Sequence, residues 1–121
     1  MKDWPPLLRL LSEDLGYSVR QGKPALGYEL FSVDLSSWKL RLTDNTPVVW
    51  VKRTDLEGTT PQHLVQSLTD VMRERNLSRQ IVLVLLEGEG EPLRRYVESP
   101  LHNLVVCGKD DQERIVGSRR P

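Results

Sequence analysis

The chain lacks long apolar runs and has almost no cysteine. Its single Cys107 excludes an internal disulfide and lies in an apolar stretch, which suits a reducing compartment. The longest apolar run, 81–86, is too short to cross a bilayer. The N-terminal residues lack the apolar region and cleavage site of a signal peptide. We therefore expect a cytoplasmic protein with no membrane partner.

Neither sign of charge is in excess. The 121 residues carry 17 Lys and Arg against 17 Asp and Glu. The balance holds in each half, with eight of each sign in 1–60 and nine of each in 61–121. No net field therefore draws the chain toward nucleic acid, although folding can still gather a local basic patch. We expect at most weak, salt-sensitive nucleic-acid binding.

Phrases that mark common cofactor and catalytic sites are also missing. The sequence holds no Walker A, dinucleotide-binding or nucleophile-elbow pattern. The two histidines, His63 and His102, have no cysteine at zinc spacing. Either could form a thiolate dyad with Cys107, but a buried structural thiol is the favoured interpretation. The stretch 87–91 is Gly-rich but acidic, and its negative charge is the wrong sign for a phosphate-binding loop, so it predicts a mobile loop. Because none of these patterns is present, no cofactor is expected.

Three segments have helical features. Leucines recur at helical spacing near the N-terminus and predict a helix over 5–15. Thr60 followed by proline is typical of a helix start, and an apolar stripe follows, which predicts a helix over 61–75 closed by Asn76. A shorter helix is expected over 92–99, ahead of a proline.

Apolar patterning also predicts the strands. Alternation on both sides of an Asp-Asn turn predicts a β-hairpin that pairs 37–43 with 47–53. The run 81–86 is apolar without alternation, which predicts a central strand covered on both faces. A loop is expected at 21–24. The other expected extended segments are 17–19, 28–35, 104–107 and, as an edge, 114–116. The predicted core comprises Leu11, Leu15, Val49, Val51, Leu64, Leu68, Val71, Val82, Val84, Leu86 and Val105.

The order of these elements predicts an α/β fold, a mixed β-sheet flanked by helices. Helices fall between strands in the second half, so right-handed crossovers and parallel neighbours are expected there. The size suits one domain over 1–116. The polar residues 117–121 are interpreted as a tail or the start of a linker, which would make this the N-terminal domain of a larger protein.

Three short phrases resemble the Mrr-type branch of the restriction-endonuclease-like, or PD-(D/E)xK, fold. Residues 15–19 read Leu-Gly-Tyr-Ser-Val, like the family phrase that follows its first helix. Residues 32–35 read Ser-Val-Asp-Leu, where the family has a Gly-x-Asp phrase. Residues 48–53 read Val-Val-Trp-Val-Lys-Arg, where the family has Val-Val-Gln-Val-Lys. The resemblance covers roughly residues 6–88 and implies a three-layer sandwich that has the sheet at its centre.

The resemblance also implies a catalytic site, and this sequence departs from it. Family members hydrolyse a phosphodiester with Mg²⁺ held by at least two oxygen ligands. By resemblance the first carboxylate is Asp34 and the lysine is Lys52. The second carboxylate would stand two residues before the lysine, where this chain has Trp50. Alternate residues of a strand share a face, so the indole would fill the metal position as a plug in the cleft.

Other candidates and simpler interpretations remain open. Glu13 on the first helix is a candidate auxiliary carboxylate, and Glu29 could join the site. Asp34 and Lys52 could equally be a strand-end carboxylate and a solvated lysine. These observations leave three functions open. The first is a binding or regulatory module without catalytic activity, within an ATPase or prokaryotic defence protein. The others are a Mg²⁺-dependent nuclease with a recruited carboxylate and an unrelated interaction domain. The expected partner is a further domain of the same chain or another protein.

Overall fold

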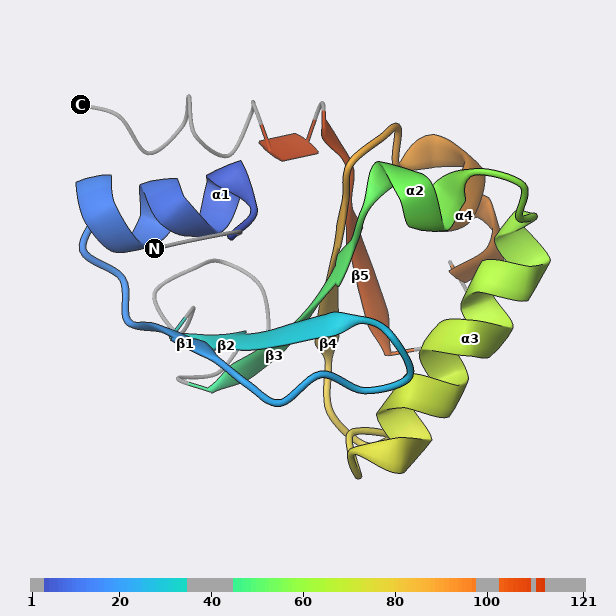
Figure 1. Cartoon of the computed structure of the whole chain (residues 1–121), viewed down its shortest axis with the longest axis horizontal. Coiled ribbons are helices and arrows are strands. Elements are labelled where there is room, and N and C mark those ends of the chain that lie inside the picture. Colours follow the sequence, from blue (N-terminus) through green and yellow to red (C-terminus); the bar gives the residue numbers. More distant parts are fainter. Residues whose placement is uncertain (1–3, 35–44, 98–102, 110, 113–121) are drawn as a thin grey trace.

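Five strands form one mixed sheet in the order β1-β2-β3-β4-β5 (Figure 1). The computed structural model describes residues 4–34, 45–97, 103–109 and 111–112. The first three strands are antiparallel neighbours, and β3, β4 and β5 are parallel, as predicted for the second half. The strands are β1 (Val19–Gln21), β2 (Glu29–Val33), β3 (Thr46–Val51), β4 (Val82–Leu86) and β5 (Leu104–Cys107).

Helices lie on both sides of this sheet (Figure 1). On one side α1 (Pro6–Arg9) continues into a π-helical turn, η1 (Leu10–Asp14). On the other side lie α3 (Pro61–Glu74) and α4 (Glu91–Val97), the two crossover helices of the parallel strands. A short helix, α2 (Arg53–Leu56), directly follows β3. The predicted α/β class, a mixed sheet flanked by helices, is therefore confirmed.

The long helix α3 begins and ends as its sequence predicts. The Thr60 side chain accepts a hydrogen bond from the backbone N–H of His63 at 3.2 Å, and Pro61 occupies the first helical position. After the helix, Asn76 adopts the left-handed conformation with φ 59°. These end signals act locally, so they could be recognised without knowledge of the rest of the fold.

The sheet separates two apolar cores. All five residues of β4 are buried, which confirms the predicted central strand. Val82, Val84 and Leu86 face the core under α3 and α4, whereas Leu83 and Leu85 face the core under α1 and η1. Of the eleven predicted core residues, nine are buried, and Leu15 and Val105 are partly buried.

Three local predictions need correction. The antiparallel neighbour of β3 is β2, with Glu29 opposite Trp50 and Val33 opposite Thr46, and not the segment 37–43. Strand β1 extends to Gln21, inside the stretch expected to be a loop. The helix α2 was not predicted, because its four residues carry no apolar periodicity. The segments 37–43, 114–116 and 117–121 lie outside the described residues, as does His102.

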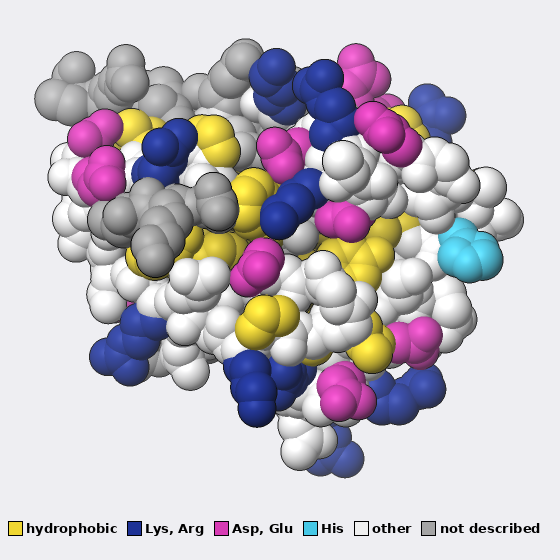
Figure 2. Space-filling view, in the orientation of Figure 1, with side chains coloured by type: hydrophobic (Ala, Val, Ile, Leu, Met, Phe, Trp, Pro, Cys, Tyr) yellow, Lys and Arg dark blue, Asp and Glu magenta, His cyan; other side chains and the backbone are white. Residues whose placement is uncertain are grey.

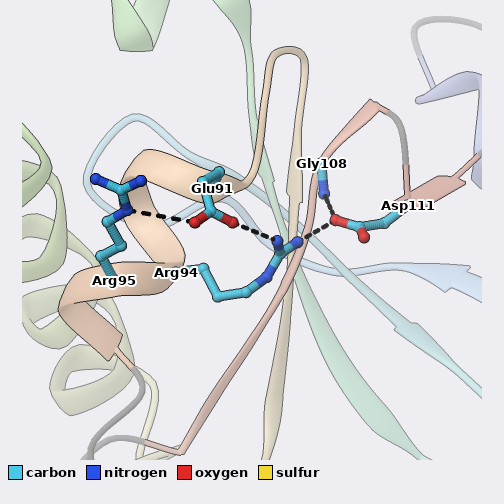
Figure 3. A network of polar contacts seen from close by, with 5 residues as sticks. All are labelled: Glu91, Arg94, Arg95, Gly108 and Asp111. Atoms are coloured by element: carbon cyan, nitrogen blue, oxygen red, sulfur yellow. Dashed lines mark hydrogen bonds and ion pairs between the residues drawn. The ribbon is translucent and has the colours of Figure 1, made fainter.

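The acidic stretch 87–91, predicted to be a loop, contacts the end of β5 through its backbone. Lys109 donates its backbone N–H to the Gly88 carbonyl at 2.9 Å. A Cβ atom on Gly108 would lie 2.3 Å from the Gly90 nitrogen, so only glycine fits there. Figure 3 shows the adjoining network, in which Arg94 pairs with both Glu91 and Asp111, and Asp111 accepts the Gly108 N–H at 3.0 Å. These ion pairs therefore bridge α4 and the segment after β5.

Truncation of the α3 stripe tests this packing. Leu68 is fully buried between α3 and the sheet. We expect Leu68→Ala to lower the free energy of unfolding by about 3 kcal/mol, through lost transfer energy and a residual cavity. The matched control is Gln66→Ala on the exposed side of the same helix, expected to change stability by about 0.5 kcal/mol or less. Urea denaturation of both variants measures the difference, and equal effects would contradict the assignment.

Candidate functional site

The register of β2 and β3 brings Glu29, Trp50 and Lys52 together at the carboxyl end of β3. Glu29 stands directly opposite Trp50, and opposite residues of an antiparallel pair project to the same face. Lys52 follows two residues after Trp50 in extended conformation and returns to that face. Its ammonium lies 4.7 Å from the centre of the indole ring, in agreement with this placement.

Asp34 lies at the other end of the same strand pair. Val33 is opposite Thr46, so Asp34 is beyond the amino end of β3, and its backbone N–H is held by the Ser18 carbonyl at 3.1 Å. At about 3.3 Å per strand residue, this places it roughly 20 Å from Lys52. The structure thus does not bring Asp34 and Lys52 into one site. The carboxylate on the strand next to Trp50 and Lys52 is Glu29.

Trp50 is a core residue and not the wall of an open cleft. Its side chain is only 7% exposed and belongs to the apolar core under α1 and η1, with Leu8, Leu11 and Phe31. The Phe31 ring lies 6.5 Å away in a tilted arrangement. Within the described part of the chain, the indole Nε1 is buried without a hydrogen-bond partner. An indole has no oxygen to offer a hard cation, so the residues at this end of β3 do not fit the Mg²⁺ site of the family.

Glu29 is held by the neighbouring strand. Its Oε2 accepts a hydrogen bond from Gln21 Nε2 at 3.2 Å, and Gln21 Oε1 accepts one from Trp4 Nε1 at 3.1 Å. Trp4 in turn meets the Phe31 ring edge-on, with ring centres 5.6 Å apart. This chain of contacts links the carboxylate to the residues before α1. Gln21 and Trp4 were not predicted at this site, because the sequence pattern placed Gln21 in a loop.

The backbone of Lys52 opens α2. Its N–H donates to Asp55 Oδ2 at 3.0 Å, a typical helix-start contact. Nearby, burial raises the pKa of Tyr28 above its ordinary value of 10.0; the Asp55 charge adds to this rise, and a hydrogen bond with Ser67 opposes it. Tyr28 therefore joins the start of β2 to α2 and α3. The one sequence signal for the start of α2 is Asp55, the acidic residue three positions after Lys52.

The remaining candidates do not join the site. Glu13 is exposed on η1. Cys107 is 3% exposed in the core under α1, whereas His63 is exposed at the start of α3 on the opposite side of the sheet, so these two do not form a dyad. Among residues 4–34, 45–97, 103–109 and 111–112, no three His, Cys, Asp or Glu side chains come close enough to hold a metal ion.

Charges of both signs are intermixed over the face that Figure 2 shows, as the balanced sequence predicts. None of the described helices is long and apolar enough to cross a membrane. A comparison of this chain with protein-family models, curated proteins and solved structures finds no match. The site must therefore be interpreted from its own chemistry.

The raised pKa of Tyr28 predicts a pH effect on stability. The folded chain disfavours the phenolate form of Tyr28. The contribution of Tyr28 to the free energy of unfolding should therefore be fully present below pH 10.0 and be lost as the pH rises through the folded pKa. Tyr28→Phe should remove this part of the alkaline loss, whereas Tyr96→Phe, at a side chain that is 45% exposed, should keep it. Urea denaturation at increasing alkaline pH measures the slopes. A Tyr28→Phe slope as steep as that of the wild type would contradict the prediction.

Proposed function

We propose that this chain is a non-catalytic binding or regulatory module of restriction-endonuclease-like ancestry. The observation that carries the proposal is Trp50, a buried indole at the position where the family has its second metal ligand. Without two oxygen ligands no ion is held to lower the pKa of an attacking water. As a module, the chain would act by binding a further domain of the same protein, such as an ATPase or defence protein, or a separate protein.

The sheet supports the ancestry. The family places the strand after the long helix parallel to the strand that carries the lysine. Here β4 is parallel to β3 over Val48 to Val51, and antiparallel β2 flanks β3 on its other side. An edge position for β4 would have opposed this interpretation, and β4 is central. The antiparallel neighbour of β3 is β2, however, and not the segment 37–43 that the ancestry predicts. The presence of helices on both faces of the sheet also supports this interpretation.

A rival function is a Mg²⁺-dependent nuclease that has recruited a carboxylate from elsewhere. The observation in its favour is that Glu29 and Lys52 share the carboxyl end of β3. Against it, the Glu29 carboxylate is engaged by Gln21, and the Lys52 ammonium lies over the Trp50 ring. Both charged groups are thus used in contacts that stabilise the fold.

A cleavage assay separates the two functions. The wild type is incubated with plasmid and single-stranded DNA in Mg²⁺ or Mn²⁺, beside the double variants Glu29→Gln/Lys52→Ala and Asp34→Ala/Lys52→Ala. We expect no metal-dependent cleavage by any of the three, because no pair of oxygen ligands faces Lys52.

Each other outcome has a definite meaning. Wild-type cleavage that disappears in the Glu29 double variant or in both would overturn the proposal and assign a nuclease to this end of β3. Loss confined to the Asp34 double variant would also overturn it and return the activity to Asp34. Equal cleavage by all three proteins would identify a contaminant and agree with an inactive chain.

A further inference from the structure

The part of the sheet that α3 does not cover contains a groove. One hollow of about 260 Å³ lies where β2 and the start of β3 meet the end of α3, and its lining includes Lys23, Leu30, Pro47, Arg75 and Leu77. A second hollow of about 300 Å³ continues along β1 and β2 past Arg20 and Asp34. Ser32 and Asn45 line both hollows, so the two hollows are neighbours, and together they are called the groove below.

The first hollow joins an apolar floor to positive charge. Leu30, Pro47 and Leu77 supply apolar surface, and Lys23 and Arg75 supply two cations. None of the described residues that line this hollow is acidic, whereas the second hollow has Asp34 beside Arg20. The Arg75 guanidinium also donates to the Pro24 carbonyl, which fixes the turn that carries Lys23 against the end of α3. A ligand that carries carboxylates beside an apolar side chain would complement this lining.

The turn before β2, three residues beyond Lys23, displays an apolar side chain in an unfavourable conformation. Ala25 and Tyr28 exchange backbone hydrogen bonds at 3.1 Å and 2.9 Å around Leu26 and Gly27, which have φ 51° and 87°. A two-residue turn of this kind favours asparagine, aspartate or glycine at its first position. Leu26 is instead found there with 59% of its surface exposed. Neither turn geometry nor burial within the chain explains a leucine at this position, whereas contact with a partner would.

We infer that this groove, together with Leu26 on the turn that follows Lys23, binds an extended acidic segment of a partner protein that contains apolar side chains. The inference rests on the proposed function, since it names the partner class of the binding module. Nucleic acid fits less well, because single strands are bound by exposed aromatic faces, and Phe31, the one aromatic side chain among the described lining residues, is 3% exposed. Leu26 and the apolar floor take the apolar side chains, and Lys23 and Arg75 face the carboxylates.

Fluorescence anisotropy with the full chain tests this assignment. The probe is a fluorescein-labelled peptide with a Leu-Glu-Leu-Glu centre between Gly-Ser flanks; the matched peptides have Gln for Glu or Ser for Leu. We expect the Leu-Glu peptide to bind at least about tenfold more tightly than either matched peptide at near-physiological salt. Equal affinities, or no binding by the Leu-Glu peptide, would overturn the inference.

Three variants locate the binding. Lys23→Glu should weaken binding about tenfold, whereas Arg9→Glu, an equal charge change on α1 across the sheet, should leave it unchanged. Leu26→Asn should weaken binding without lowering the melting temperature, because asparagine suits the turn. Equal effects of Lys23→Glu and Arg9→Glu, or full affinity of Leu26→Asn, would contradict the site.

A single-stranded oligonucleotide provides the remaining comparison. If it bound more tightly than the Leu-Glu peptide and lost affinity in Lys23→Glu, the groove would belong to nucleic acid and the inference would fail. These affinities do not depend on the cleavage assay. A nuclease result would therefore overturn the proposed function alone, and a failure of peptide binding would overturn the groove alone.

Discussion

The alternation of side chains along β3 is the constraint on which the rest of the structure depends. Hydrogen bonds to β2 on one side and to β4 on the other fix its register. Val49 and Val51 therefore enter the core under α3, whereas Val48 and Trp50 enter the core under α1. A slip by one residue would exchange the two sets, so the indole cannot leave its core without disturbing both. The burial of Trp50 thus belongs to the fold as a whole.

This constraint gives the charged groups at the carboxyl end of β3 structural roles. The Lys52 ammonium over the Trp50 ring contributes about 0.5–2 kcal/mol as a cation–π contact. The buried indole N–H, which lacks a partner among the described residues, costs about 1–3 kcal/mol. Gln21 holds the Glu29 carboxylate at 3.2 Å. An end of the sheet organised in this way is suited to stability, and the binding surface that we infer lies elsewhere, at the hollows near the end of α3.

Local signals were enough for much of the fold but could not set the pairing of strands. α3 and β4 were predictable because their end residues and apolar patterns are local. The partner of β3 was predicted wrongly, because 28–35 and 37–43 both look extended and the Asp-Asn turn favoured the nearer one. Which carboxylate lies near Trp50 depends on that pairing. The resemblance of short phrases indicated Asp34, whereas the register of β2 and β3 shows that Glu29 stands opposite Trp50. The groove was not predictable, since Lys23, Arg75 and Leu77 meet only through the fold.

The proposed function requires that the Trp50 indole stands where the family has a metal ligand and that this end of β3 binds no divalent ion. Electron paramagnetic resonance of Mn²⁺ tests it directly, because the free ion gives a strong signal that is lost on binding. We predict that the wild type leaves the free Mn²⁺ signal unchanged, as does Glu29→Gln, which keeps the shape of the side chain and removes its charge. A loss of signal in proportion to wild-type protein that disappears in Glu29→Gln would contradict the account.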